Sequence, residues 1–594
     1  MITKTKFKEF SRCPRYSALD RANRDKEDAN VASDKDDVRS ILSSMFDAGD
    51  FDMDITDDQL ETMLPFFNKL EEITAQTTAK YFEGEIQYSL NTRDQKSFQG
   101  WGENYQYICY TDVYVEADTP LIIETKATTT NKFKALKYKE NGEDECIFLR
   151  KNNTWYLKEE ILNQDYPDKY FKQREKLFNR FSDVGKYVFD LAVQRWIVER
   201  ESDKEYRYLM AVLNNEFVFD GTLTNGEPDY KMSNSEEIVS FIDLTKVTKE
   251  YQSQIDQMAT KVEQFQDELN LDEVDVGKFC ERKKTTQCKY YDICWKKVPK
   301  EDSLFTYIDN HHGFLDGDKK RFPIDLINKG ITQFEQIPHS WLNRQKNQIQ
   351  RSVYDSGKEF ISPDKLKAGL DCLEFPLYHL DFESFPCPLP RYRGEKPYTQ
   401  SVFQYSLHIQ KDYSDCDKDM DHYEFLANGF DDQRKELIES MISQLGTKGS
   451  IVVWNQGFEK GRIKEFATYF PEYKDQLYAI NERIFDLMYI LKSNSKLYTA
   501  LGFDKDYSKI FNYYHKGLQG SFSIKKVLPL FSELSYKDME VGNGMEAVVA
   551  FANLHKLDKK QYDLKYNALL KYCKQDTWAM VEITDGIKEM VDVL

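Results

Sequence analysis

Three residues in the first half of the chain have side chains suited to metal-assisted phosphodiester hydrolysis. Glu124 and Lys126 are two positions apart at the end of the apolar run LIIE, and Asp112 lies in the preceding run ICYTDVYVE. If these runs pair as strands of one hairpin, alternate residues share a face and the three side chains can converge. The carboxylates would hold Mg²⁺ or Mn²⁺, which activates water, and the lysine would stabilise developing charge. The alternative is a surface Glu–Lys pair on an edge strand, because E-x-K is a common pattern.

A second set of acidic side chains occurs in the last third of the chain. Asp381 and Glu383 are two apart in a strand pattern, and Glu459 lies where a strand is followed by a helix. Tyr572 and Asp576 are four apart in a helical pattern, so they share one helical face. Carboxylates from three such elements can hold two Mg²⁺ ions about 4 Å apart, with Tyr572 orienting the attacking water. The alternative is a set of scattered surface acids, which the agreement of order, strand placement and helix spacing disfavours.

Three of the ten cysteines cluster in one polar segment, FCERKKTTQCKYYDICW, at Cys280, Cys288 and Cys294. Thiolates at such spacing suit zinc or an iron–sulfur cluster. No histidine precedes His311, so the first half of the chain offers no imidazole ligand. The alternative is that these cysteines are buried core residues, although the lysines and tyrosines around them make the segment too polar for a core.

Local patterns place these residues in an α/β framework. Apolar runs at 105–126, separated by an Ala-Asp-Thr-Pro turn, predict a hairpin, and the polar stretch 127–180 predicts an insertion or mobile lobe. Helical periodicity returns in GKYVFDLAVQRWIVER, and residues 301–373 predict a helical connector. From residue 374 onward, strand patterns (FPLYHLDFESF, SVFQYSLHI, SIVVWN) alternate with helical ones, which indicates an α/β domain.

The bulk composition limits the class of protein. A chain of 594 residues allows two to four domains, and its 40% hydrophobic and 31% charged residues are typical of a globular protein. No apolar run is long enough to span a membrane and the N-terminus lacks the apolar core of a secretory signal, so we expect a cytoplasmic protein. The net charge of −19 argues against a protein that coats nucleic acid non-specifically. It does not argue against a nuclease, because carboxylates that bind metal ions add negative charge.

The first acidic set resembles that of the PD-(D/E)XK nucleases of the RecB-like branch, over about residues 1–300. In that branch an Asp precedes E-x-K across a hairpin and a glutamine follows on the next helix, a place that Gln194 occupies here. The resemblance implies that Asp112 and Glu124 bind the metal and that Lys126 and Gln194 complete the catalytic set. The sequence departs from the branch in its long spacing between Lys126 and Gln194 and in lacking the upstream histidine.

The cysteines resemble those of iron–sulfur nucleases of the AddB and CRISPR-associated RecB-like type. These have one early cysteine and three late ones, and the cluster fastens the two ends of the domain together. The resemblance implies that Cys13, in FSRCPRYS, joins Cys280, Cys288 and Cys294 as the fourth ligand of a [4Fe–4S] cluster, with zinc as the alternative.

The second acidic set resembles the DEDD exonucleases of the Y-x-x-x-D branch, which have an RNase H-like fold, over about residues 374–594. The motifs D-x-E, N-x-x-F-acid, FDL and Y-x-x-x-D occur in the family's order, and they include Asn455 and Asp486. The departure is Glu459, where the family has aspartate, so the geometry shifts by one methylene and activity could be reduced. Asp486 could be structural. Lys525 and Lys526 could contact substrate phosphates or form a solvated pair.

The whole chain resembles a family of uncharacterised bacterial proteins that join a RecB-like iron–sulfur nuclease region (1–300) through a helical connector (301–373) to an RNase H-like domain (374–594). The resemblance implies a metal-dependent nuclease with two modules acting on DNA, in repair, recombination or defence against mobile DNA. The second module would be a 3′–5′ exonuclease, and a helicase or another DNA-processing protein is a candidate partner. The alternatives are a nucleic-acid-binding scaffold with one or both sites inactive, and an enzyme with a single active site. The sequence does not decide whether the substrate is DNA or RNA, although DNA is favoured. It also leaves open whether the substrate is single- or double-stranded and which oligomeric state the protein has.

Overall fold

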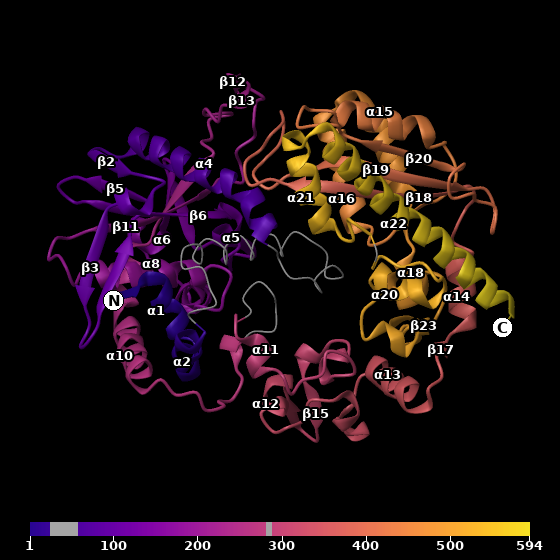
Figure 1. The fold of residues 1–594 in the computed structure, drawn as a ribbon, viewed down its shortest axis with the longest axis horizontal. Helices are drawn as coiled ribbons and strands as arrows, with labels where there is room; N and C mark the ends of the chain where they lie inside the picture. The colour runs from indigo at the N-terminus through magenta and orange to yellow at the C-terminus, as the bar shows by residue number, and fades with distance from the viewer. Residues whose placement is uncertain (24–56, 281–287, 538, 594) are drawn as a thin grey trace. The chain divides into compact units, whose positions relative to one another are not determined.

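The computed structural model describes residues 1–23, 57–280, 288–537 and 539–593. The chain divides into two compact units, and each combines sheets with helices, which confirms the predicted α/β class (Figure 1). The described residues of the first unit are 1–23, 63–280, 288–291 and 387–399, and those of the second are 57–62, 292–386, 400–537 and 539–593. Residues 301–373, predicted as a connector, are therefore part of the second unit. Within the described residues, no helix is long and apolar enough to cross a membrane.

The main sheet of the first unit has seven strands in the order β2-β5-β6-β11-β14-β10-β9. These strands are β2 (Glu85–Tyr88), β5 (Val113–Glu116), β6 (Leu121–Thr129), β9 (Phe148–Lys151), β10 (Thr154–Leu157), β11 (Arg207–Leu213) and β14 (Val239–Asp243). β5 and β6 pair antiparallel, so the predicted hairpin is confirmed. The polar stretch 127–180, predicted as an insertion or mobile lobe, contributes β9 and β10 to the edge of this sheet. Their alternating apolar residues, such as Phe148 and Leu157, are buried even though the surrounding sequence is polar.

The run ICYTDVYVE is shared between a small three-stranded sheet, which contains its first part, and the main sheet, which contains its last part. β1 (Ile2–Thr3), β4 (Gln106–Tyr110) and β3 (Ser97–Trp101) form a three-stranded sheet in the order β1-β4-β3. Two further pairs are β7 (Lys137–Glu140) with β8 (Glu143–Cys146), and β12 (Leu223–Thr224) with β13 (Glu227–Pro228). Asp112, expected on the first strand of the hairpin, therefore lies at the break between β4 and β5.

The helices of the first unit centre on α8, whose residues from Tyr187 to Val198 are all buried. The helices are α1 (Lys4–Phe10), α2 (Pro14–Ala22), α4 (Asp57–Tyr81, in this unit from residue 63), α5 (Thr130–Lys134), α6 (Lys158–Ile161), α7 (Asp168–Arg174), α8 (Gly185–Val198), α9 (Thr245–Glu250) and α10 (Gln252–Glu268). α8 contacts both β4 of the small sheet and β11 of the main sheet, which explains why it is buried on nearly all sides. α1 packs against α8, so the N-terminal residues lie beside the middle of the unit.

The main sheet of the second unit has five strands in the order β20-β19-β18-β21-β22. These strands are β18 (Leu377–Pro386), β19 (Gln400–Gln410), β20 (His422–Leu426), β21 (Ile451–Val453) and β22 (Ile484–Asp486). β18, β19 and β20 pair antiparallel, whereas β18, β21 and β22 pair parallel, so β18 is the central strand. Two short pairs are β15 (Phe314–Asp316) with β16 (Lys319–Arg321), and β17 (Phe360–Ile361) with β23 (Tyr513–Tyr514).

Helices cover both faces of this sheet. α15 (Arg434–Gln444), α16 (Gly457–Tyr469) and α17 (Lys474–Glu482) form one core with it. α14 (Pro363–Leu370), α18 (Met488–Lys492) and the long α22 (Lys559–Val593) form a second core. The other helices of the unit are α12 (Pro323–Ile327), α13 (Gln345–Ser356), α19 (Ser495–Ala500), α20 (Ile524–Val527) and α21 (Gly544–Asn553), and α11 (Tyr291–Cys294) lies where the two units meet in the sequence.

Candidate functional site

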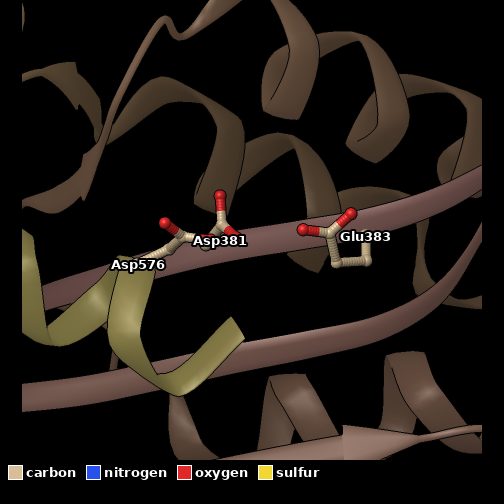
Figure 2. Close-up of side chains that lie close together, drawn as sticks. All are labelled: Asp381, Glu383 and Asp576. Atoms are coloured by element: carbon tan, nitrogen blue, oxygen red, sulfur yellow. The ribbon is translucent and has the colours of Figure 1, made fainter. Parts of the chain in front are cut away.

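Three carboxylates of the second unit come together on β18 and α22. Ligand oxygens of Asp381, Glu383 and Asp576 all lie within 4.8 Å of one another. Figure 2 shows Asp381 and Glu383 on the same strand, with Asp576 approaching from the helix beside it. The predicted convergence of these three residues therefore occurs, across almost 200 positions of sequence.

The alternation of β18 explains why both of its acids face α22. Tyr378, Leu380 and Phe382 point into the core formed with α15, α16 and α17. The odd-numbered residues Asp381 and Glu383 therefore point to the opposite face, because successive strand residues alternate in direction. The apolar even positions thus bury one face of the strand and place two acids on the other.

Side-chain hydrogen bonds from β19 hold α22 over this face. The amide of Gln404 donates to the carbonyl oxygen of Leu569 at 2.9 Å, and the hydroxyls of Ser406 and Thr577 are 2.8 Å apart. Thr577 directly follows Asp576, so these contacts fix the height and rotation of the helix at the carboxylate. Buried side-chain hydrogen bonds of this kind favour one arrangement of the elements they join.

A cavity of about 580 Å³ lies over the carboxylates and is lined by two further predicted residues, Glu459 and Tyr572. Glu459 lies in the first turn of α16, as predicted, and is buried, and Tyr572 lies one turn before Asp576 on α22. The other lining residues include aromatic side chains and lysines, namely Phe305, Trp454, Phe458, Phe522, Lys346, Lys492 and Lys525. All four predicted carboxylates and the predicted tyrosine therefore border one space.

Tyr536 is a neighbour of the site that the sequence did not single out. Its hydroxyl donates a hydrogen bond of 2.7 Å to Oδ1 of Asp576. The ammonium group of Lys525 lies 5.6 Å from the ring centre of Tyr536 and 5.9 Å from that of Tyr572. Tyr536 lies in a loop without periodicity, so no local pattern could have indicated it. The contacts place a hydrogen-bond donor and a positive charge beside Asp576.

The thiol of Cys573 lies among the three carboxylates, and their negative charge affects its pKa. Its sulfur lies 3.5 Å from Oδ2 of Asp381, and its pKa is raised well above the usual range by burial, then by the charges of Asp381, Glu383 and Asp576. The thiol therefore stays protonated and can donate to the carboxylate. Three carboxylates so close together repel one another unless a cation lies between them, and oxygen ligands suit Mg²⁺ or Mn²⁺. The residues present therefore fit a divalent cation.

Asp486 has a structural position, as the sequence allowed. Its carboxylate accepts hydrogen bonds from the backbone N–H groups of Asn455 (3.2 Å), Gln456 (3.2 Å) and Met488 (3.1 Å). It is not among the residues that line the cavity. The carboxylate instead fixes the turn between β21 and α16, which positions Glu459 at the start of that helix.

The predicted acids of the first unit also come together. Nζ of Lys126 lies 3.0 Å from Oε1 of Glu124, and both residues are on β6. Oδ2 of Asp112 accepts a hydrogen bond of 2.7 Å from the backbone N–H of Thr125, between them. Oε2 of Glu124 is buried and has no hydrogen-bond partner among the described residues, so the position offers a ligand atom to a cation.

Lys4, Lys8 and Asp190 complete this cluster, and no pattern in the sequence indicated any of the three. Nζ of Lys4 lies 2.7 Å from Oε1 of Glu124 and 3.5 Å from Oδ2 of Asp190. Asp190 also pairs with Lys126 at 2.9 Å and with Lys8 at 2.7 Å. The lysines are four apart on α1, but the sequence gives no sign that this helix packs against α8. The ammonium groups of Lys4 and Lys126 therefore lie at Glu124, which was expected to bind metal, and Lys8 pairs with the neighbouring Asp190.

The charges in this cluster shift the pKa values in opposite directions. Burial raises the pKa of Asp112 well above its usual range, and the neighbouring Glu124 raises it further. Burial also raises the pKa of Asp190, but Lys126, Lys4 and Lys8 outweigh burial and hold it well below the usual range. Asp190 is thus the permanent anion of the cluster, and a divalent cation here would have to compete with lysines.

Gln194 is buried on α8, one turn after Asp190. Its amide nitrogen donates to the backbone oxygen of Tyr110 at 2.9 Å. Tyr110 ends β4, two residues before Asp112. The glutamine therefore fastens α8 to the strand end that presents Asp112, which is a positioning role.

Three of the four predicted cysteine ligands belong to the first unit, and Cys294 belongs to the second. All ten cysteines lie in the described part of the chain and none forms a disulfide. Burial raises the pKa of Cys288 to about 11, and the negative charges of Cys13 and Cys280 contribute in the same direction. These three thiols therefore lie near one another. Their residue types fit a metal, because a bound cation would be needed to keep buried thiols ionised.

Comparison with known proteins gives a match to one family and to several relatives. The family described as "Domain of unknown function (DUF2779)" matches residues 378–523. That segment includes Asp381, Glu383 and Glu459, whereas Asp576 lies beyond it. No solved structure matches the chain.

The curated relatives are themselves described as uncharacterized proteins. MG366 of Mycoplasma genitalium is 28% identical over 258 residues, which cover 40% of this chain and 36% of that protein. The MG366 homolog of Mycoplasma pneumoniae is 29% identical over 256 residues, with the same coverage. UU173 of Ureaplasma parvum is 25% identical over 303 residues, or 46% of this chain and 39% of that protein. The chain thus spans little more than a third of the length of these relatives.

Proposed function

We propose that the second unit is a metal-dependent phosphodiester hydrolase that acts on nucleic acid. The observation that supports this most directly is the approach of Asp381, Glu383 and Asp576, whose ligand oxygens lie within 4.8 Å of one another beside a cavity. Glu459 lines the same cavity and would complete the ligand set. Mg²⁺ or Mn²⁺ bound there would polarise the phosphate and lower the pKa of a water molecule.

The chain's own residues would orient the reactants. Tyr572, on the cavity wall, would hold the attacking water through its hydroxyl. Tyr536 keeps Asp576 in one rotamer through its hydrogen bond, and Lys525 beside it would offset negative charge on the phosphate. The aromatic wall residues Trp454 and Phe458 would stack on a base of the substrate.

The proposed class of the second unit is an RNase H-like exonuclease. The position of Asp381 and Glu383 on the central strand of a mixed sheet, with Tyr572 and Asp576 on one face of a helix, supports the resemblance to the DEDD enzymes. By that resemblance the enzyme would remove nucleotides from a 3′ end, with DNA as the favoured substrate.

For the first unit we propose a PD-(D/E)XK nuclease module. Two contacts support this assignment: Lys126 pairs with Glu124 on β6, and Asp112 accepts a hydrogen bond from the residue between them. Gln194, fastened to the end of β4, supports it as well. A [4Fe–4S] cluster held by Cys13, Cys280, Cys288 and Cys294 is the proposed cofactor, and zinc is the alternative.

A nucleic-acid-binding scaffold is the second candidate function, and the ion pairs of the first unit favour it there. Lys4 and Lys126 already neutralise Glu124 and Asp190. A site whose carboxylates are satisfied by lysines can be stable without a metal and without activity.

A nuclease assay on the purified chain tests these proposals. End-labelled single- and double-stranded DNA and RNA would be incubated with Mn²⁺ and the wild type, Asp381→Asn or Glu124→Gln. Exposed acids outside both clusters, Glu482→Gln and Glu143→Gln, serve as matched controls. We expect Asp381→Asn to reduce the release of mononucleotides at least about 100-fold. Loss of a residue that merely orients a metal ligand costs up to about 100-fold, and loss of the ligand itself should cost no less. Release of nucleotides that is unchanged in Asp381→Asn would exclude the second site, and a wild type without any activity would favour the scaffold.

A further inference from the structure

Two lysines line the cavity of the second unit without an ion-pair partner in the described part of the chain. Lys346 lies on α13, from the segment predicted as a connector, and Lys492 ends α18. Both are half-buried. Neither belongs to the predicted catalytic set, and the two come from segments almost 150 positions apart in the sequence.

The surroundings of Lys346 are more apolar and more positive than those of an ordinary surface lysine. Its ammonium group lies 5.3 Å from the ring centre of Phe511. Burial lowers its pKa, and the charge of Lys492 lowers it further, against a smaller opposite effect of Asp309. The two ammonium groups are therefore close enough to repel each other.

A third lysine, Lys365, is near enough to Lys346 for the two charges to repel each other. It is fully buried and donates to the backbone oxygens of Tyr507 at 2.8 Å and Ile510 at 3.0 Å. Burial lowers its pKa to about 8, where Asp364 acts in the opposite direction and Lys346 adds to the decrease. Positive charge thus accumulates around Lys346.

Such a cluster is costly unless an anion joins it. Half-burying two like charges side by side loses hydration and adds repulsion. The chain has 101 Asp and Glu residues against 82 Lys and Arg, so carboxylate partners are not scarce. Solvation alone would explain one exposed lysine. It does not explain two half-buried lysines that border the same cavity as four carboxylates. The arrangement is typical of a place kept for a ligand's negative charge.

We propose that Lys346 and Lys492 form a phosphate-binding subsite, which holds a phosphodiester of the substrate strand other than the one that reacts. The inference rests on the proposed function, since that function makes a nucleic-acid strand the occupant of the cavity. The volume of about 580 Å³ is within the range of small-ligand sites, about 300–1,000 Å³, so the terminal part of a strand can enter. Lys346 would thus give the α13 segment a part in substrate binding.

Binding measurements test the subsite without any cleavage. Fluorescent single-stranded DNA of six nucleotides would be titrated with the full chain in EDTA, for the wild type, Lys346→Gln and Lys492→Gln. Lys367→Gln is the matched control, because Lys367 is an exposed lysine of the same unit outside the cavity and has no ion pair with the residues that the structure describes. We expect each cavity variant to bind about tenfold more weakly and to reduce the slope of log K against log salt by about 0.7, as for one phosphate contact on a single strand. Affinity and slope equal to those of Lys367→Gln would overturn the subsite.

The position of the contacted phosphate provides a second measurement. One neutral methylphosphonate linkage would be moved stepwise along the oligonucleotide from its 3′ end. At the contacted linkage the wild type should lose about tenfold in affinity, and Lys346→Gln should lose little more, because the partner charge is already absent. A penalty of Lys346→Gln that is the same at every linkage would show non-specific attraction and would also overturn the subsite.

The two proposals fail in different ways. If the lysine variants weaken binding as expected while the wild type releases no nucleotide with Mn²⁺, the subsite stands and the hydrolase is wrong. If the wild type hydrolyses DNA and the lysine variants bind like the control, the hydrolase stands and the subsite is wrong. A wild type that does not bind the oligonucleotide at all overturns the subsite.

Discussion

The ammonium group of Lys4 lies 2.7 Å from Oε1 of Glu124, although 120 positions separate the two residues. Together with Lys126 it pairs with the carboxylate of Glu124, which the sequence assigns to a metal. Whether the first unit binds a divalent cation therefore depends on the competition between an ammonium group and that cation. The contact makes the N-terminal helix α1 part of the site.

Replacing Lys4 by Met should change both stability and metal binding. Without metal, loss of a buried ion-pair partner should lower the free energy of unfolding by about 3 kcal/mol, because Glu124 and Asp190 keep fewer countercharges. With Mn²⁺, the variant should recover more stability than the wild type, since a competitor for the carboxylates has been removed. Thermal unfolding at increasing Mn²⁺ measures both effects, with the exposed Lys169→Met as the control. A variant that gains no more from Mn²⁺ than the wild type would show that this cluster binds no metal.

Replacing Tyr536 by Phe should impair the second site without unfolding it. The change removes the hydrogen bond to Asp576 and leaves that carboxylate with more freedom. We expect turnover and Mn²⁺ affinity to fall together by about 10- to 100-fold, as for other groups that orient a metal ligand. Tyr562→Phe removes a hydroxyl of α22 that donates to the backbone oxygen of Asn428, and it should change neither quantity. Reduced turnover at unchanged Mn²⁺ affinity would contradict this positioning role.

Replacing Glu459 by Gln should remove one of two bound cations from the second unit. Asp381, Glu383 and Asp576 stay in place and can still bind the other, whereas Asp381→Asn should weaken both. Mn²⁺ binding would be counted in a Glu124→Gln background, so that the first unit does not contribute. An unchanged number of bound ions in Glu459→Gln would show that this glutamate is not a ligand.

Lys365 should make stability depend on pH in the alkaline range. Its pKa is about 8 in the folded chain and near 10.5 when unfolded, so between these values the unfolded chain binds more protons. Stability should therefore rise with pH from about 8 to 10.5, by up to about 3 kcal/mol for this group. The difference in unfolding free energy between the wild type and Lys365→Met isolates the effect from other titrating groups. A difference that is constant over this pH range would contradict the assignment.

Replacing Cys288 by Ser tests the proposed iron–sulfur cluster. Anaerobically purified wild type should have a broad absorbance band near 400 nm and contain iron, and the variant should lose both. Cys146→Ser, outside the predicted ligand set, is the control. A colourless wild type that contains zinc would replace the iron–sulfur assignment by the alternative.

Local periodicity was sufficient to predict which site residues share a face when they lie on the same strand or helix. Alternation along β18 puts Asp381 and Glu383 on one face, and the four-residue spacing of Tyr572 and Asp576 puts both on one face of α22. The same rule placed Glu124 beside Lys126 on β6. These relationships depend on backbone geometry within about four residues, which the sequence determines by itself.

The partners of these residues depend on which elements pack together, and only the tertiary structure decided that. The packing of α1 on α8 brings Lys4 and Lys8 to Asp190, and a loop brings Tyr536 to Asp576. The polar composition of residues 127–180 predicted an insertion or mobile lobe and gave no sign of the two strands that this stretch adds to the main sheet. Lys346 likewise reached the cavity from a segment predicted only to connect domains. Contacts between distant segments arise from the burial of whole faces, which no short run of residues encodes.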